Sequence, residues 1–223
     1  MRRLLTLSAA AGMLLVGAGL SEAQDWFSDD FEDGVIDPAH WSAAGDITES
    51  GGFLNLLRED PDDWIQTVST YGGDYVIEMD VRLDYIVWND MFHGIAIGPE
   101  NGPFGLGVSF GYSMYGKLYM AQRNGSGGTS YYYGPDGSNK QGQWLHWVIE
   151  KLGSQVSITV DGQPVGGIPT GMVAEGSRVY LPGLYEDGDG LPHVGYTCST
   201  ADNFSIAPPI GLAPSTWASI KSL

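Results

Sequence analysis

The fold class of this chain is decided by residues Tyr75–Leu83, which read YVIEMDVRL. Apolar side chains occupy every second position, and Glu78, Asp80 and Arg82 occupy positions between them. Because successive side chains of a β-strand point to opposite faces, this alternation predicts a strand with one buried face and one solvent face. The three charged side chains should share the solvent face.

Similar short runs recur along the chain, separated by Gly, Asp, Asn and Pro. Trp144–Lys151 is apolar on both faces and predicts a central strand. Asp161-Gly162 predicts a tight hairpin turn, because glycine adopts positive φ at little cost. No long apolar period of helical spacing occurs, so we expect an all-β antiparallel sandwich. The other expected strands are Gly94–Gly98, Leu106–Phe110, Leu118–Arg123, Val156–Val160, Arg178–Leu184 and Asp202–Ile206.

The N-terminus predicts export. Arg2 and Arg3 precede an apolar run, and Ser21-Glu22-Ala23 carries small residues at the two positions that a signal peptidase reads. A membrane anchor is the alternative, but the run is short and interrupted by glycines. We therefore expect a cleaved signal peptide over residues 1–23 and a secreted or cell-surface protein with no membrane insertion after cleavage.

The remaining chain divides into a domain and a tail. Residues 24–207 are about one domain in length. Residues 208–223 begin as a proline-rich linker and end in a segment around Trp217. This tail is either frayed or a docking peptide through which the protein could oligomerise.

Charge and cysteine content limit the function classes. The 223-residue chain carries a formal net charge of −17. A surface this acidic repels nucleic acids and anionic membranes, so neither is an expected partner. Cys198 is the only cysteine in the sequence, so no internal disulfide can form. Stability must come from the core and, in one hypothesis, from a bound calcium ion.

Three pairs of segments resemble the secreted bacterial domains of the concanavalin A-like, laminin G-like jelly-roll superfamily. Their order along the chain matches the opening, central hairpin and closing strands of such domains. The resemblance implies a jelly-roll β-sandwich, in a superfamily that includes glycan-binding modules, adhesion domains, glycosidases and polysaccharide lyases. The segments are 29–34 with 37–41, Gln143–Lys151 with 156–162, and 182–185 with 201–206.

The resemblance also implies a calcium site where the first and last strands meet. The matching carboxylates are Asp30, Asp33 and Asp202, with a carbonyl of Gly52 or Phe53 as a further ligand. Calcium prefers six to eight oxygen ligands of this mixed kind. The alternative is a solvated acidic turn.

A catalytic reading starts from Glu78 and Asp80. Laminarinase-like enzymes on this fold carry Glu-x-Asp-x-(x)-Glu on one strand, with a nucleophile, a helper and an acid/base. Here Glu78 matches the nucleophile and Asp80 the helper, but the third place holds Arg82, or Leu83 with the inserted residue. Neither can exchange a proton with a glycosidic oxygen near neutral pH. We therefore lean towards a non-catalytic face on which these charges pair, and we expect His146 to be a packing residue.

Exposed aromatic rings are the candidates for sugar binding, because they can stack on the apolar side of a pyranose. We assign Trp26, Trp41, Trp144 and Trp147 to the core, because they fall in the framework segments of the resemblance. Gly105–Gly111 has a nearly bare face, which is either the floor of a groove or the cover of a neighbouring loop. The ligand-binding candidates are Trp64, Trp88, Phe92, His93, Tyr131, Tyr132 and Tyr133.

Three functions remain open. The leading prediction is a secreted, non-catalytic module that binds a polysaccharide or a cell-surface glycan or protein. The second is a glycoside hydrolase or polysaccharide lyase on the same fold. The third is a structural or assembly protein of the cell surface, suggested by the proline-rich linker and the tail.

Overall fold

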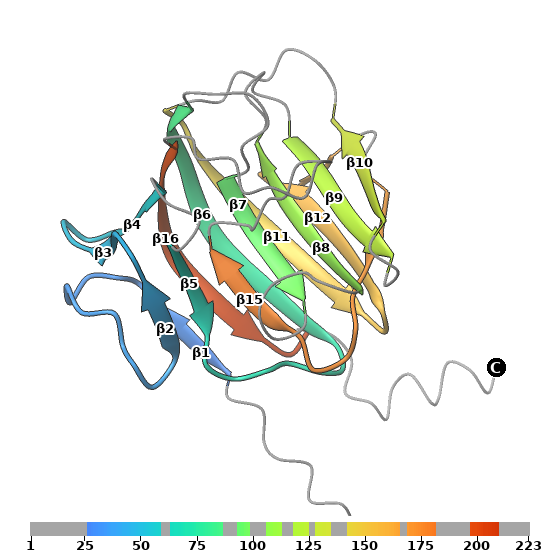
Figure 1. Cartoon of the computed structure of the whole chain (residues 1–223), viewed down its shortest axis with the longest axis horizontal. Coiled ribbons are helices and arrows are strands. Elements are labelled where there is room, and N and C mark those ends of the chain that lie inside the picture. Colours follow the sequence, from blue (N-terminus) through green and yellow to red (C-terminus); the bar gives the residue numbers. More distant parts are fainter. Residues whose placement is uncertain are drawn as a thin grey trace, which may run out of the picture.

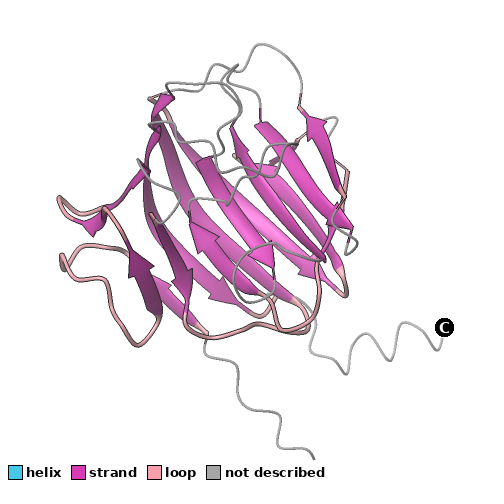
Figure 2. Cartoon of the chain, in the orientation of Figure 1, coloured by secondary structure: helices cyan, strands magenta, loops and turns pink. Residues whose placement is uncertain are grey.

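The computed structural model describes residues 26–58, 63–86, 93–98, 106–112, 118–124, 128–134, 142–165, 169–181 and 197–209. These residues form two antiparallel sheets that overlap as two layers (Figure 1). Only strands and loops occur in the described ranges (Figure 2), and so none of their residues forms a helix long and apolar enough to cross a membrane. The predicted all-β sandwich is confirmed.

Sheet A has nine strands, and its main path runs β13-β12-β11-β6-β16-β4-β3. β1 also pairs with β16, and β14 also pairs with β12. The strands are β1 (Phe27–Asp29), β3 (Ile47–Glu49), β4 (Leu54–Arg58), β6 (Tyr75–Ile86), β11 (Trp144–Leu152), β12 (Gln155–Val160), β13 (Gln163–Pro164), β14 (Gly171–Met172) and β16 (Thr197–Ala207).

Sheet B has seven strands in the order β10-β9-β8-β7-β15-β5-β2. The strands are β2 (Trp41–Ala44), β5 (Trp64–Thr67), β7 (His93–Gly98), β8 (Leu106–Tyr112), β9 (Leu118–Asn124), β10 (Thr129–Tyr133) and β15 (Arg178–Leu181).

The core lies between the sheets and follows the predicted alternation. On β6, the apolar positions from Tyr75 to Leu83 are buried, while Glu78, Asp80 and Arg82 are partly exposed on the outer face. Trp41 and Trp147 are buried as predicted. Removing this much apolar surface from water is the main stabilising contribution to such a fold.

The prediction that β11 is apolar on both faces is wrong. The strand lies inside sheet A, between β12 and β6, but only one of its faces is buried. Its residues alternate, so Leu145 and Trp147 enter the core, whereas Trp144 and His146 point outward. A sandwich of two layers covers only the inner face of each sheet, and this is why an internal strand here still has a solvent face.

The first and last strands of the domain lie side by side. Phe27 of β1 pairs with Ile206 of β16 in an antiparallel register. β16 also contains a bulge between Asp202 and Ser205, where Asn203 adopts a φ of 51°. Asparagine tolerates this left-handed conformation better than most residues, and the bulge changes the direction of its side chain.

The hairpin between β12 and β13 turns at Asp161-Gly162, as predicted. Both residues have positive φ, 50° and 71°, which fits a two-residue turn between twisted strands. The Asp161 carboxylate also accepts a hydrogen bond from the backbone N–H of His146 at 3.0 Å. The turn is thereby fixed to the strand that carries the outer-face residues.

The Lys151 side chain points inward from β11 and pairs with residues of two loops. The Lys151 side chain of β11 is 0% exposed, and its ammonium donates to the Gly73 carbonyl and to Glu175 at 3.0 Å. Glu175 in turn accepts from the Gly73 N–H at 2.7 Å. The ammonium also lies 5.4 Å from the centre of the Tyr75 ring. A buried charge needs such complete pairing.

Candidate functional site

The outer face of sheet A gathers polar and aromatic side chains from three adjacent strands. On β6, Glu78, Asp80 and Arg82 face outward at successive alternate positions. The strand register places Val148, His146 and Trp144 of β11 opposite them. On the other side, β16 contributes Ser205, Asp202 and Thr200 to the same rows.

Asp80 is the centre of this group. One carboxylate oxygen accepts from His146 Nδ1 at 2.8 Å, and the other accepts from Asn203 Nδ2 at 2.9 Å. A carboxylate only accepts, so the imidazole must carry its proton on Nδ1. Asp80 therefore fixes the orientation of two side chains from its two neighbouring strands. Asn203 reaches it because of the bulge in β16.

Glu78 lies beside this group and is available to a ligand. Its carboxylate is 3.8 Å from His146 Nε2, and the two side chains are 46% and 45% exposed. At this distance the contact is electrostatic and too long for a normal hydrogen bond. Glu78, Asn203 Oδ1 and His146 Nε2 can each exchange a solvent contact for a ligand hydroxyl.

Trp144 supplies an aromatic surface next to these polar groups. Its side chain is 38% exposed, and its ring lies 5.3 Å from that of Phe53. The Arg82 guanidinium carbon is 4.8 Å from the centre of the Trp144 ring, a cation–π contact. The prediction that Trp144 belongs to the core is wrong. The sequence held a signal for this: if Trp147 points into the core, alternation places Trp144 and His146 together on the opposite, outer side of β11.

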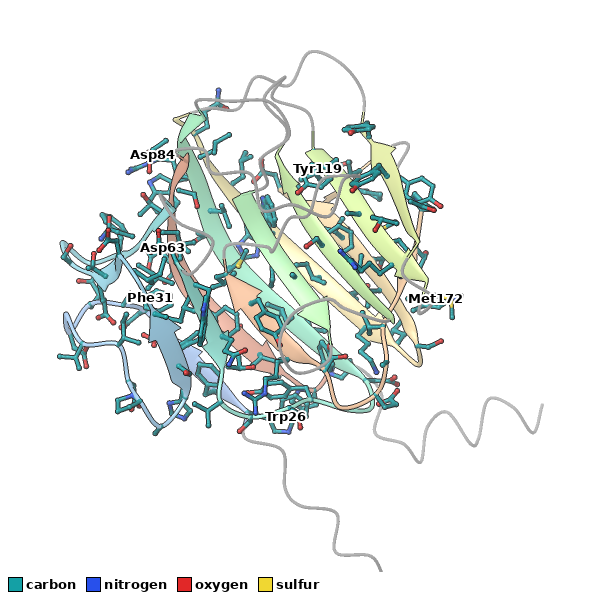
Figure 3. All side chains as sticks on the ribbon, in the orientation of Figure 1. Trp26, Phe31, Asp63, Asp84, Tyr119 and Met172 are labelled. Atoms are coloured by element: carbon teal, nitrogen blue, oxygen red, sulfur yellow. The ribbon has the colours of Figure 1, made fainter. Side chains whose placement is uncertain are left out.

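Arg82 is held at the third place of the laminarinase-like pattern. Its Nε donates to Asp84 at 2.5 Å, and its Nη2 lies 3.4 Å from the Thr200 hydroxyl. Thr200 also donates to Asp84, which lies at the upper end of β6 (Figure 3). The guanidinium is therefore tied to its neighbours on the outer face.

His146 was missed as a site residue. It is not a packing histidine, because its ring is exposed and contacts Asp80 and Glu78. The predicted ion pairs among Glu78, Asp80 and Arg82 do not form with one another. The two acids contact His146 instead, and Arg82 pairs with Asp84.

An acidic pocket of about 600 Å³ lies next to this face, beside β1. It shares Asn203 and Ser205 with the outer face of sheet A. The loop after β1 supplies most of its wall, and this loop lies at the β1–β3 side of the molecule with Phe31 (Figure 3). The lining residues are Ser28, Asp29, Asp30, Glu32, Asp33, Val35, Asp37, His40, Asn203, Phe204 and Ser205.

Several pocket carboxylates already cap their own loop. Asp29 accepts from the Phe31 N–H and from Trp41 Nε1, at 3.0 and 2.8 Å. Asp33 accepts from the Val35 N–H at 2.9 Å. Behind Asp33 lies Glu49 of β3, which accepts from the Gly34 N–H at 2.7 Å. Burial, the hydrogen-bonded contact with Asp33 and the charge of Asp29 raise the pKa of Glu49.

The predicted calcium ligands Asp30, Asp33 and Asp202 have different surroundings. Burial raises the pKa of Asp202, and the charges of Asp80 and Asp30 raise it further, although the Asn203 N–H acts in the opposite direction. Asp33 instead interacts with Glu49. Among the described residues, no three His, Cys, Asp or Glu side chains lie close enough to enclose a metal ion. The calcium site stays a prediction.

The predicted aromatic candidates do not form one patch in the described residues. Tyr131, Tyr132 and Tyr133 lie on β10, an edge strand of sheet B, and Tyr132 packs against the core. Trp64 lies on β5, separated from β10 by β9, β8, β7 and β15. His93 begins β7, and its side chain lies outside the described part, as do Trp88 and Phe92. Their role in binding stays a prediction.

The bare face of β8 is covered. Ser109 is buried, and so are its neighbours Gly107 and Gly111. Val108 and Phe110 point into the core as expected. Of the two alternatives for this segment, burial favours close cover over an open groove floor. Gly105 lies outside the described residues.

Comparisons with known proteins give the fold. Neither a protein-family model nor a curated protein sequence matches the chain. A non-specific endo-β-1,3(4)-glucanase of glycoside hydrolase family 16 matches with a TM-score of 0.59 and 11% identity, over 81% of this chain and 89% of the enzyme. An immunostimulatory antigen and pseudo β-1,3-glucanase of Mycobacterium tuberculosis matches with a TM-score of 0.57 and 12% identity, over 82% of this chain and 98% of that one.

A sialidase of Trypanosoma rangeli also matches, with a TM-score of 0.56 and 14% identity. The match covers 80% of this chain but only 30% of the sialidase. Sequence identities this low establish the architecture alone. The two antiparallel sheets and these structural matches show that the chain has the concanavalin A-like jelly-roll fold.

Proposed function

We propose that the protein is a secreted module that binds carbohydrate on the outer face of sheet A without cleaving it. The observation that carries this proposal is an exposed aromatic ring beside side chains that are already oriented. Trp144 offers a stacking surface, and Asp80 holds His146 and Asn203 in place next to it. Flat rings with a few fixed polar groups are the usual composition of a sugar site.

Each group has a separate part in binding. Trp144 stacks on the apolar side of a sugar ring, and the contact with Arg82 holds its indole in one orientation. Glu78 accepts hydrogen bonds from sugar hydroxyls, and His146 and Asn203 provide further polar contacts. Because Asp80 orients these side chains before the ligand arrives, little rotamer entropy is lost on binding.

The structural neighbours support a carbohydrate ligand by analogy. Two are described as a glucanase and a pseudo-glucanase, and one as a sialidase. A leader over residues 1–23 would deliver the domain to where polysaccharides occur. These similarities concern the fold, so the proposal depends on the residues of this face.

Hydrolysis is the second candidate, because Glu78 is about half exposed on the outer face of β6, the strand that carries the laminarinase-like pattern. A retaining glycosidase needs a second carboxyl group roughly 5 Å from the nucleophile, to act as acid and base. Arg82 stands in that place and is paired with Asp84. This pairing supports the non-catalytic proposal.

The test measures retention and cleavage in the same tubes. Purified protein is mixed with a panel of soluble and insoluble polysaccharides, and both bound protein and released sugar ends are quantified. Retention without product is expected. Trp144→Ala should weaken binding about tenfold, a loss of about 1.4 kcal/mol.

Tyr133→Ala is the matched control, because it removes another exposed ring, on the distant β10. Its affinity should equal that of the parent protein. Weaker binding by Tyr133→Ala alone would move the site to sheet B and restore the tyrosine prediction. Product that disappears in Glu78→Gln would show that the protein is a hydrolase.

A further inference from the structure

The outer-face site and the acidic pocket adjoin each other through Asn203 and Ser205. Glu78 of β6 pairs in register with Ser205 of β16, and Ser205 pairs with Ser28 of β1. Ser28 and Ser205 line the pocket, and Asn203 both lines it and contacts Asp80. A ligand that lies on Trp144 can therefore extend across β6 and β16 into the pocket.

The length of this track follows from sheet geometry. Trp144 is opposite Arg82, and Arg82 is four residues along β6 from Glu78, in whose row Ser205 and Ser28 lie. Three steps of about 4.8 Å between strands and four residues of about 3.3 Å give a diagonal of roughly 19 Å. This corresponds to roughly four linked sugars.

The track is negatively charged along its course. Glu78 and Asp202 lie on the sheet, and Asp30, Glu32 and Asp33 line the pocket. None of the described lining residues is Lys or Arg. The Arg82 guanidinium on this face is paired with Asp84. Carboxylates at this density attract a cationic ligand and repel an anionic one.

A buried carboxylate adds to the charge behind the pocket. Glu49 is 8% exposed, and within the described part of the chain no hydrogen-bond donor reaches its Oε2. Its Oε1 accepts from the N–H of Gly34, the residue after the pocket residue Asp33, so this second acid lies close to the pocket wall. A positive group bound at Asp33 would offset the repulsion between the two carboxylates. The pocket, at about 600 Å³, has room for a sugar ring that carries such a group.

We infer that the ligand is a chain of amino sugars with free, protonated amines, about four units long, which stacks on Trp144 and ends in the pocket beside β1. This inference rests on the proposed function and names its substrate class. The amines pair with the pocket carboxylates and Glu78, while the ring faces contact the indole. N-acetylation removes the positive charge, so acetylated chains of equal length should bind more weakly.

The test uses isothermal titration calorimetry with glucosamine oligomers from the disaccharide to the hexasaccharide. Affinity should rise with length and level off near the tetrasaccharide. The matched N-acetylated and neutral glucose oligomers should bind at least about fivefold more weakly. Affinity for the free-amine chains should fall as salt is raised.

Variants locate the charged subsite. Asp30→Asn combined with Glu32→Gln should lower the affinity for the tetrasaccharide about fivefold. Affinity for the disaccharide should be nearly unchanged, because a disaccharide need only occupy the Trp144 end. Glu150→Gln, on the outer face of β11 beyond the track, is the charge control and should match the parent.

The outcomes separate this inference from the proposed function. Neutral chains that bind as tightly as free-amine chains, and still require Trp144, would overturn the inference and leave the proposed function intact. So would affinity that is independent of length or of the pocket variant, or binding that requires calcium. No binding to any member of the three series or to the polysaccharide panel would overturn both.

Discussion

β11 carries one polar cluster that is buried and another that is exposed. On the inner face of β11, Lys151 is fully buried and paired with Glu175 and the Gly73 carbonyl. On the outer face, His146 is paired on one side with Asp80 and left near an exposed Glu78 on the other. In the inner cluster, the polar groups of Lys151, Glu175 and Gly73 pair with one another. The outer cluster leaves Glu78 and His146 about half exposed, as the proposed carbohydrate site requires.

The difference shows how alternation separates stability from binding. Residues five apart on one strand face opposite sides, so a single strand can close the core with one side chain and present a site with another. A buried charge must be fully paired, whereas a half-exposed one can retain water and exchange it for a ligand. Variants in the inner cluster should therefore affect folding, and variants in the outer cluster should affect binding.

The largest expected effect is the loss of stability in Glu175→Gln. The substitution leaves the buried Lys151 ammonium with only the Gly73 carbonyl and a neutral amide as partners. Because Glu175 is 62% exposed and water can replace part of its charge, the loss of unfolding free energy should be about 2 kcal/mol. Urea denaturation measures the loss. Glu150→Gln, which removes an exposed charge from the same strand, should stay within about 0.5 kcal/mol of the parent.

A second variant checks the cause of this loss. Lys151→Met added to Glu175→Gln removes the stranded charge and should recover part of the stability, because an apolar side chain suits the buried position. If Glu175→Gln alone were as stable as the parent, the inner cluster would not be the closed structural clip described above.

The next effect is on glycan affinity and concerns the opposite cluster. Asp80→Asn leaves one oxygen acceptor where there were two, so the new amide N–H₂ faces either His146 Nδ1 or the Asn203 amide, and one of the two side chains must reorient. Affinity for the retained polysaccharide should fall about tenfold, or about 1.4 kcal/mol, with the melting temperature nearly unchanged. Binding titrations and thermal melts of the same sample measure both quantities.

The exchange variant Asp80→Asn with Asn203→Asp is the control, because it restores one carboxylate and one amide. Aspartate also tolerates the positive φ at position 203. Affinity should return to near the parent value. If Asp80→Asn bound normally, or if it lost stability as strongly as Glu175→Gln, the distinction between the two clusters would fail.

Alternation predicted the sandwich and the outward-facing charges of β6. It identified β6 and its charged outer face from residues 75–83, and it identified the turn at Asp161-Gly162. Trp144 and His146 were misplaced because both fall in the central hairpin of the family resemblance, and apolar residues on both sides of β11 hide its alternation. Indole is usually buried, and here its contacts with Arg82 and Phe53 allow it to stay at the surface.

Other parts of the site depend on contacts that one strand cannot show. The role of Asn203 follows from a bulge in β16, and its contact with Asp80 spans more than a hundred residues of sequence. Lys151 occupies a core position that its residue type argues against, and only Glu175 and Gly73 explain it. Such cross-strand pairings depend on register, which local patterns leave undetermined.

Acid should weaken the inner cluster in a predictable direction. The Gly73 N–H and the Lys151 ammonium hold the pKa of Glu175 below its ordinary value. A carboxyl group with a lowered pKa stabilises the fold above its unfolded pKa, and this contribution is lost as pH falls through the folded value. Between about pH 5 and pH 3, the parent should therefore lose more stability than Glu175→Gln does. Parallel acid denaturation curves for the two proteins would contradict this.

Calcium should have the smallest effect on stability. Its addition tests whether the acidic region around Asp202 carries negative charge that a bound cation can neutralise. Burial and the charges of Asp80 and Asp30 raise the pKa of Asp202, so a cation beside Asp202 would favour its ionised form. We expect calcium to raise the melting temperature by about 2–4 °C and a chelator to reverse the rise. Asp33→Asn should reduce this response, whereas Glu175→Gln should retain it.

Because calcium and a protonated amine are drawn to the same carboxylates, calcium should also compete with the glucosamine tetrasaccharide. A melting temperature indifferent to both calcium and chelator would remove calcium from the site and leave the amine as the cation that the acidic pocket accepts.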